Sequence, residues 1–329
     1  MQPGANDVQT DLLIIGAGPT GLYAAYYGGF RGMSVAVMDS LPEPGGQVTA
    51  MYPEKMIFDV AGFPSVKGQT LTDALVEQAG QFDPTYLLGQ RAEELEHTDD
   101  EVVVRTERGL VVHAKAVLVT AGIGMFTPRP LPGAEIWEGR GLRYFVPKLS
   151  ELEGKDVLIV GGGDSAFDWA MSLEPLCTSV TLIHRRPKFR AHEGSVTKVL
   201  GSSCTVMTPY EVAEIRGEGY VQAVEVFDNS TDERTVLEVQ EVVAALGFVA
   251  DLGPIAKWGI ELRRRHILVD SAMRTNLRRV FAAGDITEYD GKVRLIATGF
   301  GEAATAVNNA AVVIDPDAHV FPGHSSDVK

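Results

Sequence analysis

The stretch DLLIIGAGPTGLYAA runs from Asp11 to Ala25 and decides the fold. Its apolar run, Leu12 to Ile15, breaks directly into a glycine turn and then into a helical pattern, so we expect a strand, a turn and a helix. In such a turn Gly16 permits the tight bend, Gly18 lets the backbone approach a pyrophosphate, and Gly21 lets the helix pack against the strand. The start of the helix then offers free N–H groups and its dipole to phosphates.

The next predicted strand, Ser34 to Met38, ends in the carboxylate of Asp39. An acidic residue about 20 positions beyond the glycines is suited to accept a hydrogen bond from a ribose 2′-hydroxyl. A glycine turn between a strand and a helix can also be purely structural, but here the second half of the fingerprint is present. Together the two halves predict a dinucleotide site.

A second unit of the same kind follows along the chain. Asp156 to Val160 reads as a strand, and Phe167 to Leu176 reads as the beginning of a helix. Ala166 stands where the third glycine would be, a replacement that the fingerprint tolerates. The residues expected to bind a second dinucleotide are Gly161, Gly163, Ser165 and Ala166.

The strand after this second turn, Val180 to Ile183, ends in basic residues and not in a carboxylate. Arg185 and Arg186 follow it, and Arg190 is close behind. Guanidinium groups suit a 2′-phosphate, which an acidic residue would repel, so the second site is expected to prefer NADP over NAD. The alternative is a solvated basic loop.

Three later stretches add candidate ligand contacts. Met51 to Pro64 places aromatic side chains among turn formers, which fits either a packed loop or an aromatic wall beside a ring system. Val280 to Ala283 is an apolar run that leads to Gly284 and Asp285, whose carboxylate could accept hydrogen bonds from sugar-like hydroxyls. Leu295 to Ile314 is an Ala-rich helical pattern whose N-terminus could also face a ligand.

Composition excludes several classes of function. A chain of 329 residues with 45% hydrophobic and 22% charged residues is long enough for two ordinary globular domains. The net charge of −15 argues against general nucleic-acid binding. No apolar run reaches the roughly 18 residues that span a membrane, and Met1 to Thr10 lacks signal-peptide features, so we expect a cytoplasmic protein without a membrane segment.

The residues that could carry metal or thiol chemistry are few. The seven histidines show no metal-ligand spacing, so no metal is expected. Cys177 and Cys204 are the only cysteines and do not form a CxxC motif, so both are expected to be inert thiols without a second cysteine close by.

The chain resembles the flavoprotein disulfide reductases, and most closely those of the short thioredoxin-reductase type. The motifs that carry the resemblance are the two glycine fingerprints, Gly284–Asp285, His184–Arg186 and Phe189–Ala191. The resemblance covers nearly the whole chain. It implies an α/β fold with two Rossmann-like domains, the NADP domain being inserted into the FAD domain. The implied boundaries are residues 1–121 and 248–329 for the FAD-binding domain and 122–247 for the NADP-binding domain, with crossings near Gly122 and Gly247.

The chain differs from the disulfide reductases in two places, and these differences limit the functions that the resemblance can imply. Thioredoxin reductases carry a CxxC just before the second fingerprint, but Gly141 to Pro147 contains no cysteine, and the first glycine turn has Thr20 where the bacillithiol-disulfide-reductase type has a cysteine. The chain instead resembles the thioredoxin-reductase-like ferredoxin–NADP reductases. The matching stretches are Gly45–Gln47, Tyr52–Lys55, Asp59–Pro64, Asp164–Trp169, Gly299–Ala303 and the tail His324–Ser326.

This resemblance implies a set of FAD contacts and a pair of side chains on the flavin. Tyr52 is expected to stack on one face of the flavin ring and His324, on the C-terminal tail, on the other. Ala92 is expected to pass the adenine by its backbone. The implied FAD contacts are Gly16, Gly18, Thr20, Gly21, Asp39, Gln47, Tyr52, Ala92, Phe126, Asp285 and Ser326.

The function that the resemblance implies is an FAD-containing ferredoxin–NADP reductase, in which NADPH reduces the flavin and ferredoxin or flavodoxin receives single electrons. No acid–base residue and no redox disulfide is required. A homodimer is implied by the family. The alternatives are a flavin oxidase or monooxygenase and a non-enzymatic flavin/NADP redox sensor. Ferredoxins are generally acidic, so a chain of net charge −15 needs a local basic surface, for which Arg263–Arg265, Arg274 with Arg278–Arg279, and Lys292 with Arg294 are candidates.

Overall fold

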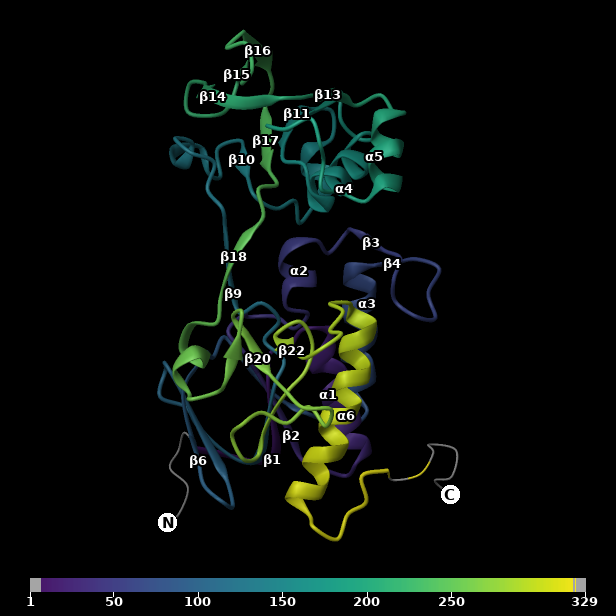
Figure 1. The fold of residues 1–329 in the computed structure, drawn as a ribbon, viewed down its shortest axis with the longest axis vertical. Helices are drawn as coiled ribbons and strands as arrows, with labels where there is room; N and C mark the ends of the chain where they lie inside the picture. The colour runs from purple at the N-terminus through teal and green to yellow at the C-terminus, as the bar shows by residue number, and fades with distance from the viewer. Residues whose placement is uncertain (1–6, 322, 324–329) are drawn as a thin grey trace. The chain divides into compact units, whose positions relative to one another are not determined.

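The computed structural model describes residues 7–321 and 323 (Figure 1). The chain divides into two compact units, one made of Met1–Met125 and Ala250–Lys329 and the other of Phe126–Val249. The second unit is therefore an insertion in the first. We call them the outer unit and the inserted unit.

The outer unit is built on a mixed sheet whose centre is β1 (Asp7–Ile15). β1 pairs in parallel with β2 (Val35–Asp39) on one side and with β8 (Val111–Val119) on the other. β2 and the second halves of β1 and β8 are almost continuously buried, as expected of parallel strands covered on both faces. The other strands of the sheet are β5 (Thr85–Leu88), β6 (Ala92–His97), β7 (Val102–Thr106) and β21 (Val280–Ala282).

β8 changes partners along its length. Its first half pairs antiparallel with β7, and its last residues pair in parallel with β21. The residues from Glu101 to Arg105 alternate in polarity, which predicts a strand of a small antiparallel hairpin. This prediction is confirmed, because β7 forms an antiparallel hairpin with β6, and the hairpin is part of the main sheet. The carboxyl ends of β1, β2, β8 and β21 consequently share one edge of the sheet.

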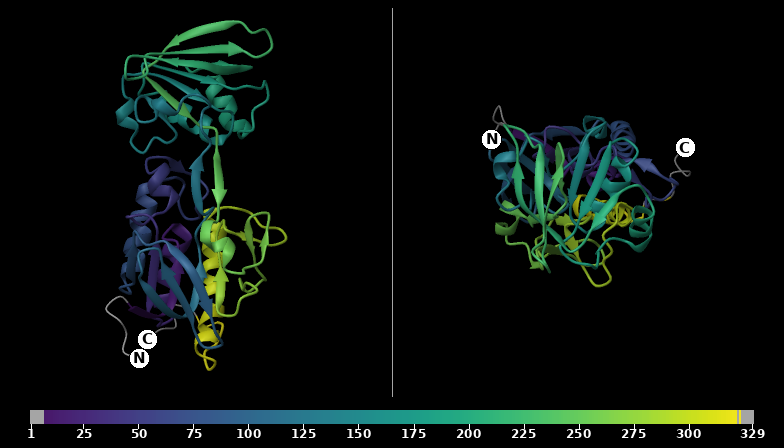
Figure 2. Two further views of the ribbon diagram at one scale, coloured as in Figure 1. Left: turned by 90° about the vertical axis from the view of Figure 1, so that its left-hand side faces the viewer. Right: turned by 90° about the horizontal axis from the view of Figure 1, so that it is seen from above.

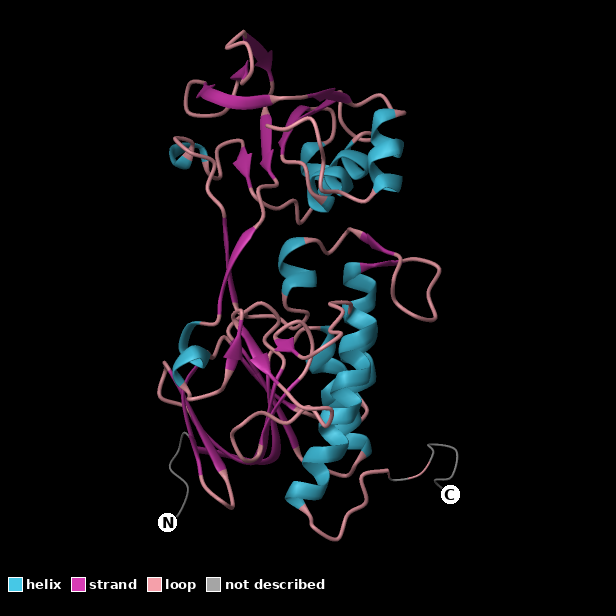
Figure 3. Ribbon diagram, in the orientation of Figure 1, coloured by secondary structure: helices cyan, strands magenta, loops and turns pink. Residues whose placement is uncertain are grey.

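Three long helices belong to this unit, α1 (Pro19–Phe30), α3 (Gly68–Gly80) and α6 (Ile296–Ile314) (Figure 3). α1 packs against both α3 and α6. The residues from Thr70 to Phe82 have helical spacing, which predicts a helix with Thr70 as its cap, but α3 begins two residues earlier and its N-cap is Lys67. The first N–H groups of α3 donate instead to carbonyls of the preceding loop, Gly68 to Lys55 (2.9 Å) and Gln69 to Pro53 (2.7 Å).

Smaller elements complete the outer unit. The short helix α2 and the β3–β4 hairpin follow β2, and a three-stranded sheet of β19, β20 and β22 follows the 3₁₀ helix η3. Their bounds are α2 Gln47–Met51, β3 Met56–Ile57, β4 Val66–Lys67, η3 Gly253–Lys257, β19 Leu262–Arg263, β20 His266–Leu268 and β22 Thr287–Glu288.

The inserted unit repeats the strand–glycine turn–helix plan on a parallel sheet. Its strand order is β10-β17-β11-β12-β13, so the first strand of the glycine motif, β11 (Asp156–Val160), is central. The remaining bounds are β10 Leu142–Arg143, β12 Ser179–Ile183, β13 Thr205–Met207, β17 Glu241–Ala244, α4 Asp164–Leu173, α5 Glu193–Leu200, η1 Glu135–Trp137 and η2 Leu149–Leu152.

A separate antiparallel sheet lies between β13 and β17 in the sequence. It contains β14 (Tyr210–Arg216), β15 (Ala223–Asp228) and β16 (Arg234–Glu238), the green strands of Figure 2. The sequence from Val221 to Ala245 contains short alternating stretches, which predict short strands, and β15, β16 and β17 confirm that prediction. The inward residues Val224 and Val226 join the hydrophobic core of the inserted unit.

The chain passes between the two units twice, through β9 (Met125–Pro128) and β18 (Phe248–Asp251), which pair with each other. Within the inserted unit the N–H of Arg129 donates to the carbonyl of Gly247 (2.9 Å). Gly122 and Gly247 both have positive φ, a conformation that glycine adopts without strain. Entry and exit of the inserted unit are therefore adjacent.

Candidate functional site

The first glycine turn shows which glycines the protein itself requires. A Cβ on Gly16, whose φ is +115°, would lie 2.5 Å from the carbonyl oxygen of Thr120, and a Cβ on Gly21 would lie 1.8 Å from that of Gly16. Both glycines are therefore fixed by close packing of α1 on the sheet. A Cβ on Gly18 would meet nothing within 4 Å. Gly18 thus leaves open space at the N-terminus of α1, the side from which a phosphate would approach.

Asp39 lies at the end of β2 and is tied to this turn. Its carboxylate accepts hydrogen bonds from the N–H of Ala17 (2.6 Å) and of Leu41 (2.8 Å). Burial raises the pKa of Asp39, and these backbone N–H groups act in the opposite direction. The bonds hold the carboxylate beside the glycine turn, where it can still accept from a hydroxyl because each oxygen has a further lone pair.

The start of β6 lies next to Asp39. The N–H of Gln90 donates to the carbonyl of Asp39 (2.9 Å), and the buried Ala92 begins β6 two residues later. Ala92 therefore lies on the same edge as Asp39, where its backbone is close to the position predicted for a nucleoside.

Thr20 joins three segments that are far apart in the sequence. Its Oγ1 lies 3.0 Å from the position that a Cβ on Gly284 would take and 2.4 Å from that of a Cβ on Gly299. Gly284 follows β21, and Gly299 lies in the first turn of α6. Thr20 is thus packed between two backbone segments, and its methyl and hydroxyl groups help to bring α1, β21 and α6 together.

The loop before α2 bridges the glycine turn and the end of β8. The N–H of Gly45 donates to the carbonyl of Ala17 (2.8 Å). The side-chain amide of Gln47 lies over Gly122, with Nε2 3.0 Å from the position of a Cβ there. Gln47 therefore places an amide group at the edge where the parallel strands end.

Tyr52 and Asp285 are brought together at this edge. Burial and the negative charges of Asp285 and Asp59 raise the pKa of Tyr52 to about 12, so Tyr52 is a neutral phenol at physiological pH. The ammonium group of Lys55 lies 5.5 Å from the centre of the Tyr52 ring. The ring is partly exposed and packs against the cluster that contains Leu22 and Val48, so it is held by apolar contacts on one side.

A buried ion pair supports Asp285, and the sequence did not predict it. Lys292 and Glu302 form it at 2.5 Å with side chains only 2% and 5% exposed. Glu302 also accepts from the N–H of Gly284 (2.7 Å) and from the hydroxyl of Tyr289 (2.5 Å). Burial raises the pKa of Asp285, and the positive charge of Lys292 acts in the opposite direction. The only signal was a charged residue in an otherwise Ala-rich helix, Glu302 in GFGEA.

The second glycine turn has the same organisation as the first. A Cβ on Gly161 would lie 2.5 Å from the carbonyl of Ala245, and one on Gly162 would lie 2.5 Å from the ring of His184, but a Cβ on Gly163 would meet nothing within 4 Å. Ala166 is fully buried beneath the turn, and Ser165 is exposed at the start of α4. Gly163 is the counterpart of Gly18, with open space at a helix N-terminus.

The basic residues after β12 lie beside this turn. The N–H of Arg190 donates to the carbonyl of Gly162 (2.8 Å), which ties the basic loop to the glycines. Arg185, Arg186 and Arg190 are exposed, and among residues 7–321 no carboxylate pairs with their guanidinium groups. Burial, and then the charges of the same three arginines, lower the pKa of His184. The loop is thus a concentrated positive charge at the edge of the inserted unit.

Comparisons with known proteins agree with this geometry. The family model described as pyridine nucleotide-disulphide oxidoreductase matches residues 10–310. The chain is 63% identical to the ferredoxin–NADP reductase of Nocardioides sp., with 99% of each chain covered, and 64% identical to that of Frankia alni, with 96% of this chain and 98% of the relative covered. The chain belongs to this family of ferredoxin–NADP reductases. The thioredoxin reductase of T. acidophilum is a solved structure of similar fold, with a TM-score of 0.81, 28% identity and coverage of 92% of this chain and 98% of the other.

Membership in the family confirms that the protein is an oxidoreductase with two Rossmann-like domains and implies FAD and NADP(H) as cofactors. The structure offers a cradle for each. Gly18 and Gly163 each leave space for a pyrophosphate, and a Cβ at either position would fill that space. Asp39 follows the first glycine turn, whereas Arg185 and Arg186 follow the second. The donor sets therefore fit a nucleotide with a free 2′-hydroxyl in the outer unit and one with a 2′-phosphate in the inserted unit.

The thiols of this family member differ from the redox pair of thioredoxin reductases. Burial raises the pKa of Cys177 to about 11, with further contributions from Asp156 and Cys204, and burial also raises the pKa of Cys204. Cys204 lies between α5 and β13, and its Sγ donates toward the carbonyl of Ala170 in α4 (3.8 Å), whereas the Sγ of Cys177 donates to the carbonyl of Leu152 (3.2 Å). Both groups are protonated thiols at neutral pH and hence poor nucleophiles.

Three predicted contacts of this reductase are not placed by the structure. His324 and Ser326 lie outside the described residues, and Phe126 lies in β9 without a described side chain. The last described part of the tail is bound at the far end of α1, where the guanidinium of Arg31 donates to the carbonyls of His319 (2.8 Å) and Val320 (3.1 Å). Arg31 is the C-cap of α1, whereas Gly18 precedes its first residue.

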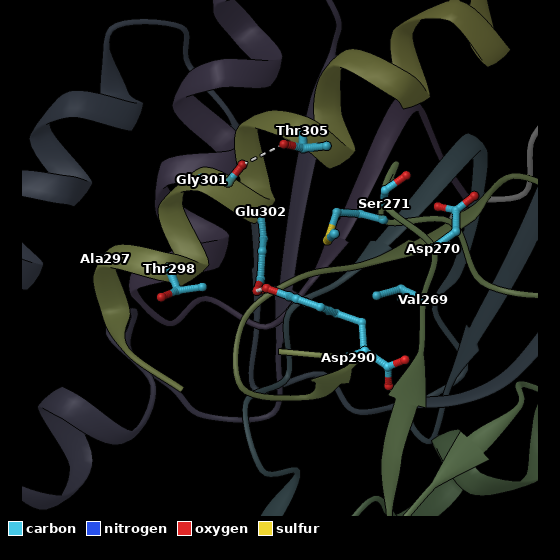
Figure 4. A pocket seen from close by; sticks show the side chains of 11 residues that line it. Val269, Asp270, Ser271, Asp290, Ala297, Thr298, Gly301, Glu302 and Thr305 are labelled. Carbon is cyan, nitrogen blue, oxygen red and sulfur yellow. Dashed lines mark hydrogen bonds between the residues drawn. The ribbon is translucent and has the colours of Figure 1, made fainter. Parts of the chain in front are cut away.

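A hollow of about 670 Å³ in the outer unit is a different feature (Figure 4). Gly301, Glu302 and Thr305 of α6 line one wall of it, and Asp270 and Asp290 lie on the opposite side. Its carboxylates would repel a pyrophosphate, and no glycine of the first turn lines it. The reductase therefore offers a nucleotide its glycine turns and not this hollow.

The described part of the chain has neither a cluster of metal-ligating side chains nor a helix that could span a membrane. No cluster of three or more His, Cys, Asp or Glu side chains is arranged to hold a metal ion. None of the helices is both long and apolar enough to cross a membrane.

Proposed function

We propose that the protein transfers electrons from NADPH through FAD to a ferredoxin or flavodoxin, without a redox-active disulfide. The observation that carries the proposal is the pair of matched glycine cradles, one followed by Asp39 and the other by Arg185 and Arg186, in a chain with no CxxC motif. Relatives 63% and 64% identical to it that are named ferredoxin–NADP reductase support the choice of carrier.

In this proposal the FAD-binding domain comprises residues 1–121 and 248–329, and the NADP-binding domain comprises residues 122–247. Gly18 and the start of α1 hold the FAD pyrophosphate, Asp39 the adenosine ribose, and Gln47, Tyr52 and Asp285 the flavin end. The contacts and packing described above support this order along one edge of the sheet, because each of these residues follows or adjoins the carboxyl end of a parallel strand. Phe126, His324 and Ser326 remain predicted contacts.

NADPH is assigned to the second turn. Gly163 and Ser165 receive its pyrophosphate at the N-terminus of α4, and Arg185 and Arg186 hold its 2′-phosphate, with Arg190 nearby. The exposed positions of these arginines support the assignment, because guanidinium groups there can form paired hydrogen bonds with phosphate oxygens.

When bound, FAD supplies the chemistry by accepting a hydride from NADPH and releasing two electrons singly. The protein's residues bind and orient. Tyr52, neutral because its pKa is about 12, presents an uncharged ring to an apolar partner. The buried ion pair of Lys292 and Glu302 fixes Gly284 and thereby the backbone of Asp285. No side chain is required as a nucleophile, in accord with the raised pKa values of both thiols.

We also propose that the protein is a cytoplasmic homodimer, as the resemblance to the family implies. Sedimentation velocity of the full chain tests the oligomeric state, and a monomer at micromolar concentration would overturn this part of the proposal.

Stopped-flow reduction by NADPH, followed by reoxidation with ferredoxin or with air alone, tests the function. Fast reduction and ferredoxin-dependent reoxidation support the proposal. Reoxidation by air at the same rate with or without ferredoxin would favour the oxidase, and binding of NADPH without flavin reduction would favour a redox sensor.

A further inference from the structure

The outer unit has three basic clusters that could attract an acidic partner, and two of them are engaged within the protein. In the cluster of Arg274, Arg278 and Arg279, Arg278 pairs with Asp99 (2.7 Å). Arg279 donates to the carbonyls of Asp99, Lys115 and Val313. This cluster lies near the start of β21, since the carbonyl of Arg279 accepts from Val117, and so at the end of the strand away from Asp285.

The second cluster, Lys292 with Arg294, is also neutralised. Lys292 is buried against Glu302, and Arg294 pairs with Glu288 (2.6 Å). Neither charge is available to a partner without breaking an ion pair.

The third cluster presents charge at a hairpin tip. Arg263 pairs with Glu288 (3.2 Å) and Asp290 (3.0 Å), so those carboxylates are occupied by Arg263 and Arg294. Arg264 and Arg265 form the two-residue turn between β19 and β20, and both are exposed. Among the residues that the structure describes, no carboxylate pairs with Arg264.

The backbone of this turn is unfavourable for arginine. Arg264 has a φ of 53° and Arg265 one of 65°, and Arg263 pairs directly with His266 across the turn. Two central residues with positive φ characterise a type I′ hairpin, for which Asn-Gly is strongly preferred. Arginines in these positions strain the backbone, and such strain is found where a site requires particular side chains.

The register of the small sheet places the turn beside the candidate flavin site. β20 and β22 are parallel, with Ile267 opposite Thr287, and the N–H of Ile267 donates to the carbonyl of Ile286 (2.7 Å). Arg265 precedes Ile267 by two residues, and Asp285 precedes Thr287 by two. The turn and Asp285 therefore lie at the same end of the paired strands.

We propose that the turn between β19 and β20 is the docking contact for the acidic carrier protein, a ferredoxin of which a carboxylate pairs with the guanidinium group of Arg264. This inference rests on the proposed function. It answers how a chain of net charge −15 receives an acidic partner, because the steering charge is local and lies beside the flavin end of the site. Complementary charge of this kind acts mainly on the rate of encounter and on its salt dependence.

The turn permits a variant that removes the charge without removing the hairpin. Arg264→Asn with Arg265→Gly introduces the residues that a type I′ turn prefers, so the melting temperature should be unchanged or higher. Arg278→Asn, exposed on the same unit but at the other end of β21, is the control for the loss of a positive charge away from the turn.

The measurements are ferredoxin-dependent reduction of cytochrome c across ionic strengths and NADPH-dependent reduction of ferricyanide. We expect the KM for ferredoxin to rise about 5- to 10-fold at low salt in the Asn-Gly variant, with a flatter salt dependence and unchanged ferricyanide rates. Arg278→Asn should behave as the parent. Arg264→Glu with Arg265→Gly changes the charge of the turn by three units and should raise KM further, which tests the direction of the effect by charge reversal.

Two failures are distinguishable. If the parent reduces ferricyanide but not ferredoxin, the proposed function is wrong and the docking proposal with it. If the parent reduces ferredoxin and both turn variants keep its KM and salt dependence, only the docking proposal is overturned.

Discussion

The substitution Glu302→Gln tests whether the buried ion pair of Lys292 and Glu302 supports the flavin site. The amide keeps the size of the side chain and removes its charge, so the ammonium of Lys292, 2% exposed, loses its counterion. The N–H of Gly284 and the hydroxyl of Tyr289 lose a charged acceptor at 2.7 and 2.5 Å. The change therefore acts directly on the residue that precedes Asp285.

Breaking a buried ion pair by removing one partner destabilises by about 3–5 kcal/mol. In a domain of 150–250 residues each kcal/mol lowers the melting temperature by roughly 2–4 °C, so the expected decrease is roughly 6–20 °C. Lys292→Met should destabilise similarly, because it leaves the carboxylate of Glu302 unpaired. The double variant should recover part of the loss, since no unpaired charge remains.

The pKa of Asp285 separates this account from general loss of packing. Burial raises it, the charge of Lys292 lowers it and that of Glu302 raises it. Lys292→Met should therefore move it up and Glu302→Gln should move it down, which carbon-13 labelling of aspartate and NMR titration would measure. A decrease in melting temperature below 2 °C in both single variants, or pKa changes of the same sign, would refute the reasoning.

Replacing Arg185 and Arg186 with Ala should lower the preference for NADPH over NADH by about 10² to 10⁴, because each charged hydrogen bond contributes roughly 1.5–3 kcal/mol; an unchanged ratio of kcat/KM for the two nucleotides contradicts this. Replacing Cys177 and Cys204 with Ser should leave ferredoxin-dependent cytochrome c reduction intact, and its loss in a folded, FAD-loaded variant would refute the thiol-free mechanism. Burial and neighbouring arginines lower the pKa of His184, so its contribution to stability is present above the unfolded value of about 6.5 and is lost as pH falls from there toward the folded pKa. The variant His184→Asn should flatten that part of the stability–pH profile, and an unchanged profile counts against the assignment.

The sequence predicted the local structure around the candidate site residues, whose role in binding a cofactor stays a prediction. The two glycine turns, Asp39 and the arginines after β12 each lie within a strand–turn–helix unit, whose geometry follows from a few adjacent residues. The sequence pattern also predicted different roles for the three glycines of the first turn. In the structure Gly16 and Gly21 are required by close packing, whereas Gly18 is not.

Contacts between distant segments could not be predicted in the same way. Glu302 meets Lys292 only because α6 returns beside the loop after β21. Likewise, the basic clusters looked equivalent along the chain. Their difference depends on Asp99, Glu288 and Glu302, which neutralise some arginines and lysines and leave Arg264 exposed.

The pairing of β9 with β18 has a consequence for how such a protein can be taken apart. Paired strands lie about 4.8 Å apart, so the two ends of the inserted unit nearly meet. A short linker joining Met125 to Ala250 would close the outer unit without stretching its sheet, and the segment from Phe126 to Val249 could be exchanged for that of a relative in one piece. Such an exchange would replace the residues that determine nucleotide preference and would leave the two segments of the outer unit unchanged.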